Sequence, residues 1–329
     1  MNIDAIAKEF GCRVLYSKPL RAVNLTQTDK GLMIIKETCR GPDKILYIHE
    51  LKEYLFENGF KELDRYLISA YQLPFAVYEN RIYIMEKFIE GRECSFTNPY
   101  DRKAIIKTLA ELHNAGKGYI PPLGAARRNN IGKWTKSYIG KIEDLEEFKK
   151  LAGKKRKKGS LDKMFLEDVD FYLEMCWRGF DTLKNSKYHD ICKKAETDNA
   201  ICHHDYTYHN LIIEPGGRVS VIDFDYSCHE LPVYDLAALI QKILKRYSYD
   251  VDIALELLED YCKIAPLGKE ELVLMLSLFE FPQKFWRITE RYYRGKTDWD
   301  EKTFLSKYED IVVMKEFVLD FVEGFRKYI

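Results

Sequence analysis

The stretch that decides the fold reads CHHDYTYHN over residues 202–210 and continues as LIIEPGGRVSVIDFD over residues 211–225. Its aliphatic and β-branched runs predict short strands over 200–202, 211–213 and 219–222, and the Pro-Gly-Gly between the last two predicts a turn. Reduced to its polar positions, the stretch is His-x-Asp, an Asn five residues after the Asp, a hairpin, and then Ile-Asp-Phe-Asp. We therefore expect two carboxylates and an amide at the ends of neighbouring strands.

Three residues of this stretch have the chemistry of a phosphate-transfer site. Asp205 is placed to orient an acceptor hydroxyl and take its proton, so we expect it to be the catalytic residue. Asn210 and Asp223 offer amide and carboxylate oxygens, which are the hard ligands that Mg²⁺ prefers. The spacing His-x-Asp-x-x-x-x-Asn is that of the catalytic loop of kinases. ATP and Mg²⁺ are thus the expected cofactors.

The same pattern resembles the aminoglycoside phosphotransferase and choline kinase superfamily, whose catalytic stretch reads His-Gly-Asp-x-x-x-x-Asn followed by Ile-Asp. Within that superfamily, the chain is most similar to the CotS-type spore coat protein family of spore-forming bacteria. The resemblance covers essentially the whole chain. Four further stretches carry the narrower similarity: Leu109-Ala-Glu-Leu-His113, Pro232-Val-Tyr-Asp-Leu236, Phe281-Pro-Gln-Lys-Phe-Trp286 and Lys296-Thr-Asp-Trp299.

This resemblance implies a fold, an activity and partners. The fold would be α+β and protein-kinase-like, with a small β-rich lobe and a larger, mostly helical lobe. The activity would be transfer of the γ-phosphate of ATP to a hydroxyl of a small molecule, linked to bacterial spore formation. The partners would be that acceptor, whose identity is unknown, and other spore coat proteins. His203 and Asp235 would support the catalytic loop structurally rather than react.

The distribution of predicted strands and helices divides the chain into the two expected lobes. Residues 1–88 are predicted to form a five-stranded, nucleotide-binding sheet with one helix, which follows Gly41-Pro42 and stops at Asn58-Gly59. Residues 89–329 are predicted to form the second lobe, with the hinge, the catalytic loop and a helical region that binds the acceptor. Six segments are candidates for the five strands of that sheet: 13–16, 22–26, 32–36, 66–70, 75–78 and 81–88.

The first lobe should also carry the residues that bind the nucleotide. Lys36 ends the apolar run Met33-Ile-Ile, as the lysine of Val-Ala-Ile-Lys does, and should contact the α- and β-phosphates. Its partner should be a glutamate of the following helix, Glu50 or alternatively Glu53, because the helical register does not decide between them. By the resemblance, the hinge backbone binds adenine through the carbonyl of Glu86 and the N–H of Phe88.

The composition excludes several other classes of protein. The chain of 329 residues has 52 basic and 52 acidic side chains, so broad electrostatic capture of nucleic acid is not expected. No apolar run approaches the roughly 20 residues that span a bilayer, and the N-terminus lacks an apolar signal core. The 8 cysteines are scattered and suit reduced thiols. We expect a location in the mother-cell cytoplasm or the spore coat.

Two features leave the function open between three alternatives. The loop Ser17–Ala22 has no glycine, so backbone N–H groups are not expected to cradle phosphates there, and Lys18 or Arg21 would have to replace them. This favours a structural coat protein that kept the fold and lost turnover. The short gap from Asp223 to Pro232 leaves no room for a long activation segment, which weighs against a protein kinase. The intact catalytic residues favour a small-molecule kinase.

Overall fold

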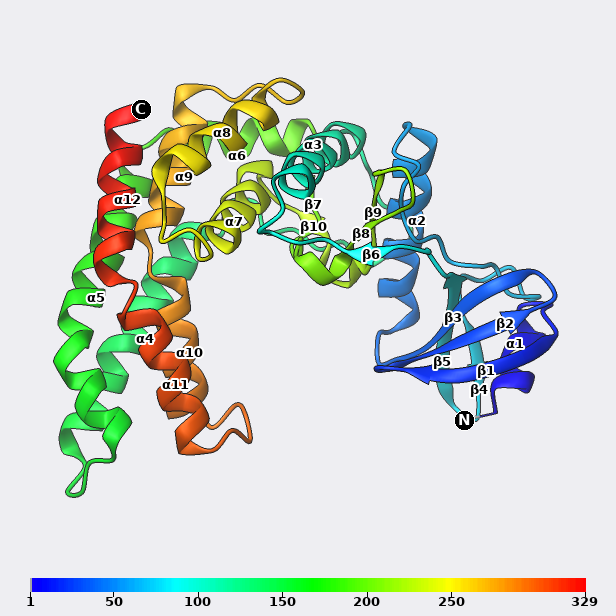
Figure 1. The fold of residues 1–329 in the computed structure, drawn as a ribbon, viewed down its shortest axis with the longest axis horizontal. Helices are drawn as coiled ribbons and strands as arrows, with labels where there is room; N and C mark the ends of the chain where they lie inside the picture. Colours follow the sequence, from blue (N-terminus) through cyan, green and yellow to red (C-terminus); the bar gives the residue numbers. More distant parts are fainter. Residues whose placement is uncertain (1) are drawn as a thin grey trace. The chain divides into compact units, whose positions relative to one another are not determined.

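A computed structural model describes residues 2–329. The chain forms two compact units (Figure 1). The first unit ends at Asn129 and resumes over Thr197–Asp235, and the second comprises Asn130–Glu196 and Leu236–Ile329. The lobe boundary expected at residue 88 falls within the first unit and stays a prediction. Among the described residues, no helix combines the length and the apolar character that a bilayer span requires.

The first unit begins with an antiparallel sheet of five strands in the order β1-β2-β3-β5-β4, which confirms the expected five-stranded sheet (Figure 1). The turn from β2 to β3 uses Gly31, whose φ of +113° is the left-handed conformation that glycine adopts freely. The expected strand over 66–70 is absent; this segment makes only a single bridge from Tyr66 to Glu86. The strands are β1 (Val14–Leu20), β2 (Val23–Thr28), β3 (Gly31–Thr38), β4 (Ala76–Tyr78) and β5 (Arg81–Lys87).

Two helices accompany the sheet rather than the single one expected. Helix α1 (Ile3–Glu9), which is capped by the Asn2 side chain, packs Ile6 and Phe10 against the sheet residues Met33 and Met85. Helix α2 (Pro42–Glu57) begins with a proline in its first turn and ends at Asn58, as the sequence predicts. Its buried residues are mostly aliphatic and include one lysine: Ile45, Tyr47, Ile48, Leu51, Lys52 and Leu55.

A second β region of the first unit follows the expected strands closely. Strands β6 (Arg92–Glu93), β8 (Leu211–Ile213) and β9 (Val219–Val221) form one small sheet, and β7 (Ile201–Cys202) pairs with β10 (Cys228–His229). Short 3₁₀ turns, η1 (Tyr208–Asn210) and η2 (Phe224–Tyr226), lie beside these strands. Helix α3 (Pro99–Ala115) is capped by the Asn98 side chain. The polar residues singled out in the sequence therefore lie in the loops and 3₁₀ turns next to these short strands.

The second unit is helical, and its core is aromatic. Phe165 and Tyr172 of α5 stack on Phe285 of α10, with ring centroids 5.9 and 3.7 Å apart. Gly179 lets α5 approach α9 closely, because a Cβ there would lie 3.1 Å from the backbone of Ser277 and of Phe281. The helices of this unit are α4 (Trp134–Lys154), α5 (Ser160–Lys184), α6 (Tyr188–Thr197), α7 (Pro232–Leu244), α8 (Val251–Cys262), α9 (Lys269–Glu280), α10 (Gln283–Tyr293), α11 (Glu301–Val312) and α12 (Lys315–Tyr328). The last residue of α6 and the first turn of α7, up to Asp235, belong to the first unit.

Candidate functional site

The loop after β7 brings the predicted catalytic residues together. His203 is fully buried, and burial lowers the pKa of its imidazole, so the ring is neutral. Its Nε2 lies 3.1 Å from the carbonyl oxygen of Ile222, and its Nδ1 accepts the N–H of Asp205 at 3.3 Å. The Asn210 amide nitrogen donates to the backbone oxygen and the carboxylate of Asp205, at 3.0 and 3.2 Å. The imidazole therefore ties the loop to the end of β9, and the Asn210 amide oxygen is left for another ligand.

Asp235 holds this loop by its backbone N–H groups. Its buried carboxylate accepts the backbone N–H groups of His203 at 2.6 Å and of His204 at 3.0 Å, and it lies 3.5 Å from Nε2 of His113. Burial by itself would raise the pKa of Asp235, but the hydrogen bond and charge of His113 outweigh burial and lower that pKa to about 2. These contacts agree with the supporting role expected for Asp235.

His204 occupies a position that suits glycine. Its φ is +68°, in the left-handed region that costs an ordinary L-residue roughly 1–2 kcal/mol. The superfamily stretch His-Gly-Asp has glycine at this place, and the backbone conformation explains why. Here the imidazole of His204 stacks on the ring of Tyr234, with centroids 4.4 Å apart and planes 12° from parallel. That contact offsets part of the cost of the conformation.

Asp223 is the second non-glycine residue of the site in the left-handed region, with a φ of +63°. Its N–H donates to the carboxylate of Asp64 at 3.0 Å. Its Oδ1 is buried, has no hydrogen-bond partner in the part of the chain that the structure describes, and lies 3.7 Å from Nζ of Lys36. The backbone of Asn210 accepts the N–H of Ile222 at 3.0 Å, and the Asn210 amide oxygen and the Asp223 carboxylate oxygen are ligands of the kind that Mg²⁺ takes. The residues present therefore fit the expected metal.

Lys36 lies in the site, but its carboxylate partners are not those expected. Its Nζ is 3.3 Å from Asp225 Oδ2 and 3.7 Å from Asp223 Oδ1. Burial lowers the pKa of Lys36, and the charges of these two carboxylates outweigh that effect and raise it above its usual value. The alternative partner, Glu53, instead receives a hydrogen bond from Arg65 at 2.9 Å. The expected pair of Lys36 with a glutamate of α2 is thus corrected to a pair with the 223–225 segment, and Glu50 keeps only a predicted role.

The register of α2 explains this correction. Helix α2 buries a lysine where a glutamate was expected. The side chain of Lys52 is 1% exposed and lies on the same face as Ile48 and Leu55. Its Nζ is 2.9 Å from Asp64 Oδ1 and 3.7 Å from Glu86 Oε2. No apolar pattern predicts a lysine on the buried face, because its partners come from elsewhere in the chain. Lys52 and Asp64 are therefore site residues that the sequence analysis missed.

The two residues assigned to adenine both have further contacts. The side chain of Glu86 lies 3.7 Å from Lys52 Nζ, where burial and the Asp64 carboxylate raise the pKa of Glu86 to about 8, so it is mostly protonated at neutral pH. Its backbone belongs to β5. The N–H of Phe88 donates to the carbonyl of Leu32 at 3.0 Å. Adenine would have to replace that bond to be bound by Phe88. The adenine contacts of Glu86 and Phe88 stay predictions.

Further cations surround Asp225. The guanidinium of Arg40 lies 3.6 Å from its carboxylate, and Nη1 of Arg128 donates to its backbone oxygen at 3.0 Å. Arg21, considered above as a substitute phosphate ligand, forms an ion pair with Glu93 at 2.7 Å. The positive charge nearest to the acidic segment 223–225 therefore comes from Lys36, Arg40 and Arg128, and not from the glycine-free loop.

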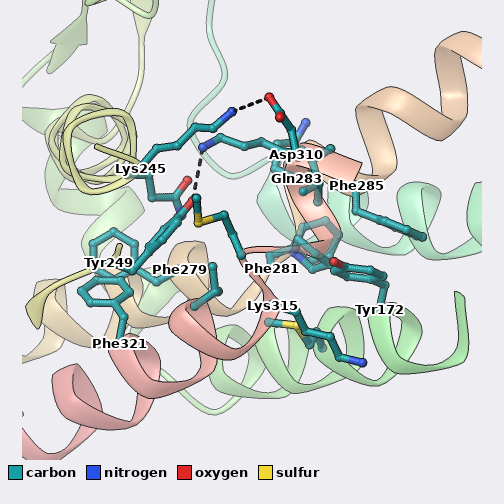
Figure 2. Close-up of a pocket in the computed structure, with 17 residues that line it drawn as sticks. Tyr172, Lys245, Tyr249, Phe279, Phe281, Gln283, Phe285, Asp310, Lys315 and Phe321 are labelled. Atoms are coloured by element: carbon teal, nitrogen blue, oxygen red, sulfur yellow. Dashed lines mark hydrogen bonds and ion pairs between the residues drawn. The ribbon is translucent and has the colours of Figure 1, made fainter. Parts of the chain in front are cut away.

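A pocket of the second unit contains none of the predicted site residues (Figure 2). Tyr249, Phe279 and Phe321 contribute aromatic walls, and Lys245 at one side forms an ion pair with Asp310 at 3.2 Å. Lys284 lies 3.4 Å from the Tyr249 hydroxyl. This pocket is a mainly apolar cavity with a charged rim, and the sequence analysis did not anticipate it.

Comparison with known proteins gives a family. The family model described as "Spore coat putative kinase YutH" matches residues 4–325. Spore coat protein S of Bacillus subtilis (strain 168) is 23% identical over 309 residues, which are 91% of this chain and 85% of that protein. The resemblance to spore coat proteins drawn from the sequence is confirmed.

Solved structures show the fold. An aminoglycoside phosphotransferase from Alicyclobacillus acidocaldarius has a TM-score of 0.84 at 18% identity, covering 98% of this chain and 95% of that one. A spectinomycin phosphotransferase in complex with ADP and spectinomycin has a TM-score of 0.66 at 13% identity, covering 98% and 97%. These neighbours confirm the predicted protein-kinase-like fold, with its small antiparallel sheet and larger helical part.

Proposed function

Because the chain belongs to the spore coat putative kinase YutH family, we propose that it transfers the γ-phosphate of ATP to a hydroxyl group of a small molecule. The observation that carries this proposal is the assembly of Asp205, Asn210, Asp223 and Lys36 in one unit of the structure. Asp223 Oδ1 is buried without a hydrogen-bond donor among the described residues, and a bound cation would satisfy it.

Each residue has a distinct part in the proposed reaction. Bound Mg²⁺, held by Asn210 and Asp223, would neutralise charge on the phosphates. Lys36 would exchange its present carboxylate partners for phosphate oxygens. Asp205 would orient the acceptor hydroxyl and take its proton late in the transfer. His203, fixed as the neutral imidazole, would keep Asp205 in place through its backbone N–H.

The acceptor is proposed to be a small molecule. Only eight residues lie between Asp223 and Pro232, so the long segment with which protein kinases hold a polypeptide has no place in this chain. Proteins with a similar fold are named as phosphotransferases of aminoglycosides and spectinomycin. We further propose that residues 1–88 bind the nucleotide, that residues 89–329 carry the catalytic loop and the acceptor region, and that the protein acts in the mother-cell cytoplasm or the coat.

A structural role in the coat is the second candidate. This role is favoured by the glycine-free loop, whose Arg21 is paired with Glu93. It is also favoured by the carboxylates that already form ion pairs with Lys36. Nucleotide binding would then be weak, and no acceptor would be turned over. Other coat proteins would be the partners.

The deciding experiment uses the full chain with radiolabelled ATP and Mg²⁺ against a panel of sugars, amino alcohols and small-molecule extract. We expect phosphate transfer to one acceptor class and its loss in Asp205→Asn. A wild-type protein that neither binds Mg²⁺-ATP nor labels any acceptor, while assembling into coats, would support the structural role instead. Equal transfer by wild type and Asp205→Asn would refute the catalytic assignment.

A further inference from the structure

The two left-handed residues of the site are held in the same way. The N–H of His204 is accepted by the buried carboxylate of Asp235, and the N–H of Asp223 is accepted by the buried carboxylate of Asp64. Asp235 lies 31 positions after His204, whereas Asp64 lies 159 positions before Asp223, in the segment between α2 and β4. A contact of such long range at a strained backbone position calls for a physical account.

Asp64 is itself firmly anchored. Its side chain is 4% exposed, and its Oδ1 lies 2.9 Å from Nζ of Lys52, whose side chain is 1% exposed. The Lys52 ammonium also lies 4.0 Å from the centre of the Tyr66 ring. The chain is held on both sides of Asp64, because Leu63 bridges to Val221 and Tyr66 bridges to Glu86. The carboxylate therefore has little freedom to move away from Asp223.

The two carboxylate oxygens of Asp64 have different partners. Oδ1 faces the ammonium of Lys52, and Oδ2 accepts the N–H of Asp223. A left-handed backbone is unfavourable for an aspartate, so it persists only where the surroundings over-determine it. Rotation of the peptide before Asp223 would break the bond to Asp64 and would turn the Asp223 carboxylate away from its present place beside Lys36.

We infer that Asp64, held by Lys52, is a positioning residue that sets the backbone of Asp223 so that its carboxylate faces the metal and the phosphates. The part of this inference that concerns metal and nucleotide rests on the proposed function. The part that concerns the backbone of Asp223 does not. In this arrangement α2 communicates with the metal-binding segment through Lys52 and Asp64, and not through a glutamate that pairs with Lys36.

The chain offers a matched control in Asp101. This carboxylate has the same 4% side-chain exposure, accepts a backbone N–H from Ser95 at 2.7 Å, and binds Arg92 at 2.6 and 2.7 Å. It lies in the same unit but contacts no residue of the site. Asp64→Asn and Asp101→Asn therefore remove carboxylates of the same exposure that each accept a backbone N–H, and only the first lies beside Asp223. The partner of Asp64, Lys52, is buried whereas Arg92 is exposed, and the double variant described below accounts for that difference.

Two measurements test the inference. The first is hydrogen exchange of the Asp223 amide, and the second is binding of Mn²⁺ with ADP, followed by electron paramagnetic resonance. We expect Asp64→Asn to speed exchange at Asp223 and to weaken Mn²⁺–ADP binding, each at least tenfold, while Asp101→Asn changes neither. Unchanged exchange in Asp64→Asn, or faster exchange with unchanged Mn²⁺–ADP binding, would overturn the positioning role.

A double variant separates positioning from general loss of stability. In Asp64→Asn, an amide whose oxygen accepts the N–H of Asp223 turns its NH₂ group toward the Lys52 ammonium. With Lys52→Met added, that repulsion is gone, so the double variant should recover most of the slow exchange and most of the Mn²⁺–ADP affinity. If exchange at Asp223 and Mn²⁺–ADP affinity in the double variant equal those of Asp64→Asn, Lys52 has no part in positioning Asp223. If wild type binds no Mn²⁺–ADP at all, the proposed function fails, and the exchange at Asp223 alone decides the role of Asp64.

Discussion

Replacing Asp235 by asparagine should loosen the catalytic loop without touching any residue proposed to react. Asp235 accepts the N–H groups of His203 and His204, and His113 lies 3.5 Å away. An asparagine has one acceptor oxygen in place of two and no charge. The two loop N–H groups would then share one neutral oxygen, since Asp235 Oδ2 already lies 2.6 Å from the His203 nitrogen and 3.3 Å from the His204 nitrogen. The left-handed His204 would lose its 3.0 Å bond to Oδ1, and both bonds would lose the charge of their acceptor.

The pKa of Asp235 gives the size of the effect. The pKa is about 2 in the folded protein, against about 3.9 for an unperturbed aspartate, and each unit of difference corresponds to about 1.4 kcal/mol. The carboxylate therefore contributes about 2–3 kcal/mol. Hydrogen bonds to a charged group, at roughly 1.5–3 kcal/mol each, give a similar size. Exchange of the loop amides should thus be faster by about 30- to 150-fold in Asp235→Asn at pH 7.

The dependence on pH has a definite sign. Because folding lowers the pKa of Asp235, its stabilisation is complete above about pH 5 and is lost as the pH falls through 4 towards 2. Wild type should lose protection of the His203 and His204 amides over that range, relative to the intrinsic exchange rate. Asp235→Asn should show no such loss from this site. Asp4→Asn, which removes an exposed carboxylate of α1, is the control and should behave as wild type.

The reasoning would be refuted by equal amide protection in Asp235→Asn and wild type at pH 7. It would also be refuted by an acid-dependent loss of protection that survives in Asp235→Asn with the same midpoint. Hydrogen exchange followed by mass spectrometry on peptides over 200–206 measures both quantities, and it reports on this loop separately from the rest of the chain.

Three further predictions concern the site. Asp205→Asn should leave ATP affinity near wild type and lower the rate of transfer, or of the slow ATPase reaction, by roughly 10²-fold or more, which single-turnover kinetics would detect; an unchanged rate would exclude Asp205 as the base. Asp223→Ala should abolish Mg²⁺-dependent ATP binding in calorimetry, and unchanged affinity would count against its metal role. His204→Ala should be less stable than His204→Gly by about 1 kcal/mol in thermal unfolding, because both variants lose the stacking on Tyr234 and only alanine keeps the left-handed strain; equal stabilities would mean that the strain is small.

The parts of the fold that local sequence determines were predicted well. The strands of the second β region, the turn between β8 and β9 and the end of α2 at Asn58 depend on residues a few positions apart. The spacing of Asp205 and Asn210 is equally local, and the structure joins them by two hydrogen bonds. The strand expected over 66–70 failed because its β-forming residues make only one bridge before the chain turns.

The missed parts depend on contacts between distant residues. The apolar periodicity of α2 identifies its buried face but does not predict that Lys52 belongs to it, because that lysine is acceptable there only with Asp64 and Glu86 beside it. The short helix α1 has few apolar positions and gives a weak pattern. The left-handed conformations of His204 and Asp223 could not be predicted either, since neither residue is glycine.

The separation of Lys36 from Asp225 by 189 positions has a consequence for synthesis. At the roughly 5–20 residues per second of a ribosome, about 10–40 seconds pass between the emergence of the two residues. The five strands and α2 can meet during that interval, since all of them precede residue 88. Lys52 and Asp64 can pair early, whereas Lys36 has neither of its present carboxylates until the last third of the chain has begun to appear. A nascent chain arrested before residue 223 should therefore hold a formed sheet whose lysine is open to solvent anions, ATP included.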